Sequence, residues 1–250
     1  MEEKNPKTPW LERPVLSTLP AITYEVVLFA AIMVLAVLSR FYNLGARVMS
    51  HDESLHTYFS WLLYKGNGYQ HNPMMHGPLQ FHLIALSYFL FGATDFTARI
   101  PAAIFNIATI AMAWPWRRYL GKAGGLVAAF LMLISPIMLF YGRYVREDPY
   151  AIFAGVVMLY AVLRYLEDGQ RRYLYILAAS LLLHFIDKET SFMYAAELLL
   201  FLAVYFIFRV TRRAWQDTRS YQAFIVTLVI GILLLGAGAG LGLMSRQNAT

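Results

Sequence analysis

The chain has 250 residues, of which 59% are hydrophobic and only 14% are charged, and its formal net charge is +6. Soluble globular domains are about half apolar and about one quarter charged, so this composition excludes an ordinary soluble domain. The absence of cysteine excludes disulfides and thiol chemistry. Basic residues are spread among the segments between apolar blocks, which membrane orientation explains better than nucleic-acid binding.

The apolar blocks have about the length, roughly 17–25 residues, that a helix needs to cross a bilayer. We therefore predict an all-α, polytopic integral membrane protein with about seven transmembrane helices. Residues 1–23 form a cytoplasmic N-terminal segment, and residues 24–250 form the membrane domain. The predicted spans are Tyr24–Tyr42, Arg99–Trp116, Gly124–Tyr141, Tyr150–Tyr165, Tyr173–Ile186, Ser191–Phe208 and Tyr221–Leu243.

One further apolar stretch, Pro78–Gly92, is compatible with either a crossing or a surface helix. The positive-inside rule favours the surface helix. If the N-terminus is cytoplasmic and this stretch does not cross, 13 of the 21 basic residues lie inside, against 8 if it crosses. Those 13 are Lys4, Lys7, Arg13, Arg117, Arg118, Lys122, Arg164, Arg171, Arg172, Arg209, Arg212, Arg213 and Arg219. The prediction is a multi-pass protein of the plasma membrane with a long, helical first outer loop over residues 43–98.

Asp52 and Glu53 lie just beyond the first predicted span. Because they are adjacent, they point in different directions on a helix. One carboxylate can face a cavity and act as a general base while the other holds structure. The alternative is a helix N-terminus, with Ser50 or Asp52 as the cap and Glu53 near the positive end of the helix dipole.

Two later clusters of charge lie at span ends on the same predicted face. Arg143 and Arg146, next to Asp148, have the forked donors that suit a phosphate group. Lys188, in the short connection between two spans, adds a point charge. The alternatives are a salt-bridged loop for the first cluster and side chains that extend towards lipid headgroups for the second.

Histidine is concentrated in the first outer loop, where the spacing matches no zinc signature. The sequence therefore predicts polar contacts with a substrate or headgroup in preference to a metal site. Glu197 lies inside the sixth predicted span, facing either a cavity or a basic partner. The loop histidines are His56, His71, His76 and His82.

These clusters, in this order, resemble the GT-C membrane glycosyltransferases, in particular the protein O-mannosyltransferase and aminoarabinose-transferase branch. The segment from His51 to Arg99 is most similar to the flippase-activity-associated, GT-C-like proteins. His76 stands where that branch has Lys or Arg, and Gly77 replaces the first proline of its Pro-Pro motif. Such enzymes usually have more spans, so we expect an N-terminal fragment or a shortened member. The elements that carry the resemblance are Asp52-Glu53, His76–Leu79, Phe91–Arg99, Asp148 and Lys188–Thr190.

The resemblance implies a GT-C-like fold and an inverting glycosyltransferase. Its donor would be a polyprenyl-phosphate-linked sugar, and its acceptor a hydroxyl of a glycan, lipid or protein on the extracytoplasmic face. Asp52 would take the acceptor proton, Glu53 would orient the site, and Asp148 would be a second acidic contact. A divalent cation is left open, and Asp148 is the alternative ligand for it. The residues implied in lipid-phosphate binding are His76, Arg143, Arg146 and Lys188.

Two readings of a different kind compete with this one. A non-enzymatic partner in lipid-linked-sugar translocation would use the same cavity to bind the lipid phosphate without cleaving it. A solute transporter would have internal repeats and helices broken near mid-membrane, and the clustering of charge on the outer face argues against it.

Overall fold

The computed structural model describes residues 9–15, 22–70, 76–215 and 217–247, with side chains described as far as residue 238. The described residues form helices and contain no β-strand, only an isolated antiparallel bridge between Pro14 and Thr23. This confirms the predicted all-α class. The chain divides into two compact units, Met1–Leu198 and Leu199–Thr250, which are described separately.

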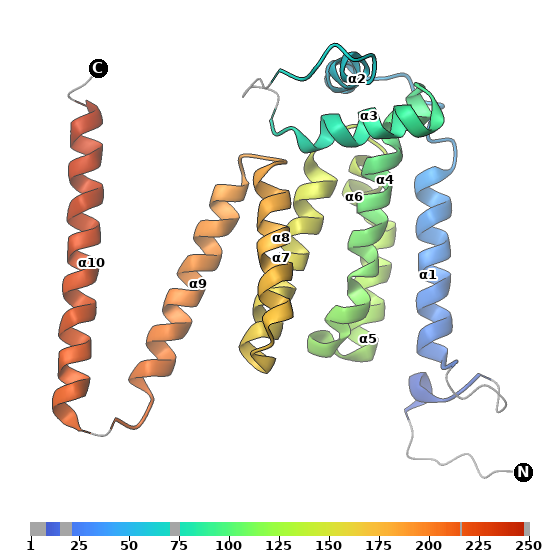
Figure 1. Ribbon diagram of the computed structural model, residues 1–250. Helices are drawn as coiled ribbons and strands as arrows, with labels where there is room; N and C mark the ends of the chain where they lie inside the picture. Colours follow the sequence, from blue (N-terminus) through green and yellow to red (C-terminus); the bar gives the residue numbers. More distant parts are fainter. Residues whose placement is uncertain (1–8, 16–21, 71–75, 216, 248–250) are drawn as a thin grey trace, which may run out of the picture. The chain divides into compact units, whose positions relative to one another are not determined.

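The first unit contains a set of upright helices that pack on their neighbours (Figure 1). Helix α1 contacts α4 and α5, α4 contacts α7, and α7 contacts α8. A short 3₁₀ helix, η1, packs near the beginning of α1. The bounds are η1 Trp10–Glu12, α1 Tyr24–Phe41, α4 Asp95–Ala111, α5 Ala113–Ile134, α6 Pro136–Tyr141, α7 Asp148–Asp168, α8 Arg171–Phe185 and α9 Ser191–Thr211, which continues into the second unit.

The chain reverses direction inside α5, at Gly121. This residue has φ 74° and ψ 166°, outside the helical region, and glycine adopts such a positive φ without steric cost. Ala113 and Ala129, eight residues before and after it, belong to the same buried cluster. The continuous stretch Asp95–Ile134 therefore contains two helical segments joined by a reversal, where the sequence predicts two spans.

Within the described residues, five helical stretches are long and apolar enough to cross a membrane. The sequence predicts about seven spans, and two features account for the difference. The reversal at Gly121 lies inside one stretch, where the sequence predicts two spans. Helix α8 has 15 residues, about 22 Å at 1.5 Å per residue, and is shorter than a hydrocarbon layer of about 30 Å. The five stretches are Tyr24–Phe41, Asp95–Ile134, Asp148–Asp168, Ser191–Thr211 and Thr218–Gly238.

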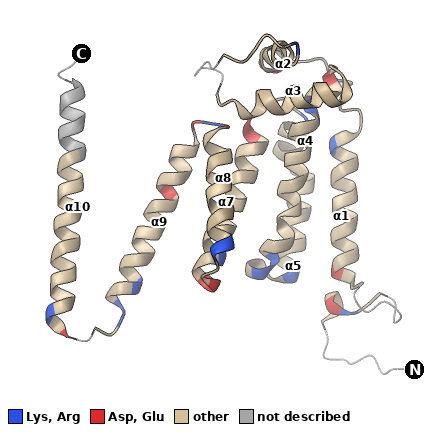
Figure 2. Cartoon of the chain, viewed as in Figure 1, with Lys and Arg blue, Asp and Glu red and all other residues tan. Residues whose placement is uncertain are grey.

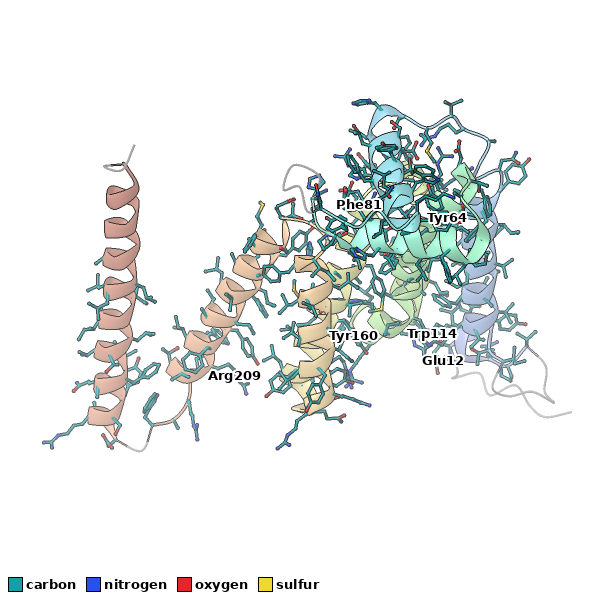
Figure 3. The ribbon with its side chains drawn as sticks, turned by 45° about the horizontal axis from the view of Figure 1, so that its top comes forward. Glu12, Tyr64, Phe81, Trp114, Tyr160 and Arg209 are labelled. Atoms are coloured by element: carbon teal, nitrogen blue, oxygen red, sulfur yellow. The ribbon has the colours of Figure 1, made fainter. Side chains whose placement is uncertain are left out.

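Helices α2 (His51–Tyr64) and α3 (Leu79–Phe91) form the predicted helical loop at one end of the first unit. Figure 1 shows α3 lying across the ends of the upright helices, with α2 packed on it. Figure 3 shows Tyr64 and Phe81 at this end and Trp114 towards the opposite one. On α3, Ile84 and Tyr88 are buried, while Phe89 is exposed. One side of the helix thus anchors it, and exposed aromatic residues of this kind suit a membrane interface.

The second unit consists of the rest of α9 and helix α10 (Thr218–Gln247). Aromatic rings pack where these helices are joined. The ring centroid of Phe224 lies 6.2 Å from that of Phe206 and 5.4 Å from that of Trp215. The large apolar side chains of α10 that the structure describes are mostly exposed. A helix that is apolar on all sides is typical of a segment that is surrounded by lipid or by other helices.

Candidate functional site

A capping box begins helix α2. The Ser50 hydroxyl accepts a hydrogen bond from the Glu53 N–H at 3.4 Å, and Glu53 Oε2 accepts one from the Ser50 N–H at 3.2 Å. Ser50 Oγ also lies 2.5 Å from the Tyr144 hydroxyl. This arrangement satisfies the N–H groups of Ser50 and Glu53 reciprocally. It confirms that the acidic pair lies at a helix N-terminus, and it leaves the neighbouring Asp52 exposed.

Glu53 is fully buried and holds several segments together. Arg99 donates to both of its oxygens, at 2.9 and 3.1 Å, while Arg47 and the Val145 N–H donate at 2.8 and 3.1 Å. Burial would raise the pKa of Glu53, but the hydrogen bonds from Arg99 and the backbone outweigh it and hold the pKa below its ordinary value. Glu53 therefore joins α2, α4 and the loop before α7.

A continuous series of ion pairs, which we call the ion-pair chain, links Asp52, Arg146, Asp148 and Lys188. Arg146 Nη1 lies 2.9 Å from Asp52 Oδ2, and Arg146 Nε lies 3.2 Å from Asp148 Oδ2. Lys188 Nζ donates to Asp148 Oδ1 at 2.6 Å. The structure thus brings together residues that are up to 136 positions apart in the sequence. The side chain of Asp52 is 52% exposed, whereas that of Lys188 is 15% exposed.

The loop before α3 docks on the loop between α8 and α9. The Gly77 N–H donates to the Asp187 carbonyl at 2.8 Å, and the Leu79 N–H donates to the Ile186 carbonyl at 3.1 Å. His76, at φ 65°, places Nδ1 2.7 Å from Glu189 Oε2. A proline at position 77 would lack the donor that this contact uses. The structure therefore gives a reason for glycine where the related branch has proline.

Replacing Gly77 by alanine should disrupt this docking. A Cβ atom at position 77 would lie 2.1 Å from the Ile186 carbonyl oxygen, so one loop must move. Overpacking of this kind typically costs about 1–3 kcal/mol. We expect a lower thermal unfolding temperature in detergent. Gly231→Ala is the control, because no atom lies within 4 Å of its added Cβ; equal unfolding temperatures of the two variants would contradict the prediction.

Arg143, which the resemblance implies in phosphate binding, lies apart from the ion-pair chain. Its guanidinium donates to the carbonyl oxygens of Tyr42 and Asn43, at 2.6 and 3.2 Å, near the end of α1. The last carbonyls of a helix have no partner within it, so an arginine here completes the helix end. His76 also lies outside the ion-pair chain and is paired with Glu189.

Arg40 was not expected from the sequence to be a structural residue. It is fully buried and donates to the Met132 and Leu133 carbonyls, at 3.1 and 2.8 Å, and to Asn106 Oδ1 at 3.0 Å. Pro136 has no N–H to offer the Met132 carbonyl, and Arg40 supplies the missing donor. The sequence signal is an arginine inside an apolar span with a proline in a neighbouring one.

Several ionisable groups lie buried around the ion-pair chain. Glu147 and Asp187 are fully buried, and His56 Nε2 lies 3.3 Å from Glu147 Oε1. Burial, followed by the charges of His76 and Arg146, lowers the pKa of His56 to about 4. Burial and then the Glu147 charge raise the pKa of Asp187 to about 9. From the sequence, Glu147 and Asp187 were recognisable only as charged residues near the ends of predicted spans.

Among the described residues, no three His, Asp or Glu side chains are grouped so as to hold a metal ion. His71 lies outside the described residues, and the ring of His82 contacts the Pro78 carbonyl at 2.8 Å. Glu197 is exposed on α9. The sequence left a divalent cation open, and no observation on the described residues tests it.

Comparison with known proteins adds a family to this geometry. No individual curated protein matches the chain. A family model described as dolichyl-phosphate-mannose-protein mannosyltransferase matches residues 75–235, well over half of the chain. The matched region contains Arg146, Asp148 and Lys188 of the ion-pair chain, and it begins after Asp52. The chain therefore belongs to the dolichyl-phosphate-mannose-protein mannosyltransferase family, a family of GT-C membrane glycosyltransferases.

Proposed function

We propose that the protein transfers a sugar from a polyprenyl-phosphate donor to an acceptor hydroxyl, with inversion, at the membrane face that carries α2 and α3. The observation that supports this most directly is the ion-pair chain: a carboxylate on α2 shares an arginine with the start of α7, and a lysine completes the series. Membership of the family supports a lipid-linked sugar donor.

The donor phosphate is assigned to Arg146 and Lys188. Both cations contact Asp148, and Arg146 also contacts Asp52. Their charges are thus balanced by carboxylates that a phosphate can replace. An arginine fork and a lysine are well suited to phosphate oxygens. In the reaction the polyprenyl phosphate leaves and gains negative charge, so the same two cations stabilise the transition state.

Asp52 is assigned as the base that removes the acceptor proton. Inverting transfer needs one base and a stabilised leaving group, and the ion-pair chain offers both. Once phosphate takes Arg146, the exposed carboxylate of Asp52 is released for this task. Glu53 acts as a positioning residue, because it fixes the N-terminus of α2 through Arg99.

The site is proposed to face the extracytoplasmic side, with a cytoplasmic N-terminus. Figure 2 shows Lys and Arg gathered at the other end of the first unit, near the α5 reversal and the end of α7. Since basic residues favour the cytoplasmic side, that end is assigned to the cytoplasm.

Single-cysteine labelling tests this orientation, and the natural chain contains no cysteine to interfere. Cysteines at exposed Asn67 and Asp95, on either side of α3, should both react with a membrane-impermeant maleimide from outside intact cells. A cysteine at exposed Gln170 should react only after the cells are opened. Labelling of position 95 only from the cytoplasm would reverse the topology after α3 and reject the proposed site.

A transfer assay tests the activity itself. Membranes that contain the protein should move label from a radiolabelled polyprenyl-phosphate sugar to a peptide, glycan or lipid acceptor, with polyprenyl phosphate released. Parallel reactions with EDTA show whether a divalent cation takes part. If the donor binds and no acceptor is ever labelled, the alternative function applies, a non-enzymatic protein that binds or translocates lipid-linked sugars.

A further inference from the structure

Two carboxyl groups, those of Glu147 and Asp187, lie buried next to the ion-pair chain. Glu147 sits between Arg146 and Asp148 in the sequence, and Asp187 precedes Lys188. Both residues have zero exposed surface. None of their four carboxyl oxygens has a hydrogen-bond partner among the described residues. Buried polar groups nearly always have partners, so this pair calls for a physical explanation.

The groups that interact with this pair come from α2, from α7 and from the loops before α3, α7 and α9. Glu147 interacts with His56, His76, Arg146 and Lys188, and Asp187 interacts with Glu147, Asp148, Lys188, Glu189 and the buried Tyr150. The two strong cations are already committed, because Arg146 contacts Asp52 and Asp148, and Lys188 contacts Asp148. His76 is paired with Glu189. The Glu147–Asp187 pair therefore has no cation of its own in this part of the chain.

An unpaired buried carboxylate is so costly that the group takes up a proton instead. Burial raises the pKa values of both Glu147 and Asp187, and their mutual repulsion adds to the effect for Asp187. His56 does not supply a compensating charge, because burial lowers its pKa to about 4. Two buried groups of like charge that interact are expected to titrate as a pair.

Building on the proposed function, we propose that Glu147 and Asp187 hold at least one proton between them, and that this proton permits Arg146 and Lys188 to bind the donor phosphate. The two cations already face the carboxylates of Asp52 and Asp148. Loss of the proton to solvent would add a further negative charge beside the incoming phosphate. Glu147 and Asp187 are thus positioning residues that set the charge of the phosphate site.

Donor binding as a function of pH is the first test. The probe is a short-chain polyprenyl monophosphate, titrated against the purified full chain in detergent between pH 7 and 9.5. The second pKa of a phosphate monoester is about 6, and that of lysine is about 10.4, so both charges stay nearly constant over this range. We expect the affinity of the wild type to fall about tenfold, the equivalent of about one pKa unit of interaction. Asp187→Asn and Glu147→Gln should bind with much weaker pH dependence.

The second test detects the proton without any donor. Infrared spectra of the wild type should contain a protonated-carboxyl band that weakens above pH 9 and that is reduced in Asp187→Asn. The matched control is Asp95→Asn, which removes an exposed carboxyl outside the ion-pair chain and should retain the band and the pH dependence of the wild type. Two variants are used, so that failure of one to fold does not end the test.

The outcomes separate the inference from the proposed function. An identical pH dependence in the wild type and both variants, or an unchanged carboxyl band, would overturn the inference and leave the proposed function intact. If the wild type binds no polyprenyl phosphate at pH 7, the proposed function fails together with the phosphate half of the inference. The infrared band then still decides whether the pair holds a proton.

Discussion

Replacing Asp52 by asparagine is expected to lower the rate of sugar transfer by about 10²–10⁴-fold, the usual cost of losing a general base. Asparagine keeps the shape of the side chain and a hydrogen bond to Arg146, but it cannot accept the acceptor proton. The side chain is exposed, so the fold should be unaffected. Initial rates with a labelled polyprenyl-phosphate sugar, together with donor affinity and unfolding temperature, measure the effect.

Arg146→Ala is the matched comparison, because it removes the other half of the same ion pair. We expect it to weaken donor binding, whereas Asp52→Asn should leave donor binding close to that of the wild type. Full activity of Asp52→Asn would reject Asp52 as the base. Glu53 is a poor substitute in that event, since both of its oxygens accept hydrogen bonds from arginines and it is fully buried.

Hydropathy and turn signals predicted most of the fold. The reversal at Gly121 falls among Arg117, Arg118 and Lys122, where the sequence predicts a break between spans. The sequence offered a helix N-terminus at the acidic pair as one of two alternatives, and the structure shows one, with a capping box between Ser50 and Glu53. In this box Glu53 turns back to the helix end, which leaves Asp52 for the surface.

The roles of the arginines could not be read from local sequence. Arg143 and Arg146 are three residues apart, and either suits a phosphate equally well. Arg143 is directed to the end of α1, where it donates to the Ser39 carbonyl in the last turn and to the Tyr42 carbonyl just beyond it. Which arginine meets Asp52 depends on how α1, α2 and the loop before α7 pack, and hydropathy contains no such information.

The sequence also does not show which of two adjacent charged residues is buried. Glu147 and Asp148 are neighbours, yet only Asp148 reaches the ion-pair chain, while Glu147 is fully enclosed. The same contrast separates Asp187 from Lys188. Which of two adjacent residues is buried and which is ion-paired depends on the residue at which the helix begins. Helix boundaries are predicted from sequence only to within a few residues, so this choice could not be predicted.

Glu53→Gln is expected to destabilise the folded protein by about 3–5 kcal/mol, the typical cost of breaking a buried ion pair by removing one partner. The substitution leaves the fully buried guanidinium of Arg99 without its counter-charge, 2.9 Å from a neutral amide. Unfolding of the purified protein by a denaturing detergent measures the loss. Asp95→Asn, at an exposed position on the same helix as Arg99, is the control and should change little.

The double variant Glu53→Gln/Arg99→Met distinguishes an ion pair from a mere gap in packing. Removing both charges eliminates the unpaired guanidinium, so the double variant should be more stable than Glu53→Gln alone. The pH dependence of the folding stability provides a second test. Because the pKa of Glu53 is lowered in the folded state, its contribution is present above the ordinary glutamate pKa and is lost as the pH falls through the folded value. The stability difference between wild type and Glu53→Gln should therefore shrink in acid. A difference that stays constant from neutral to acidic pH would show that the carboxylate charge does not hold α2 against α4.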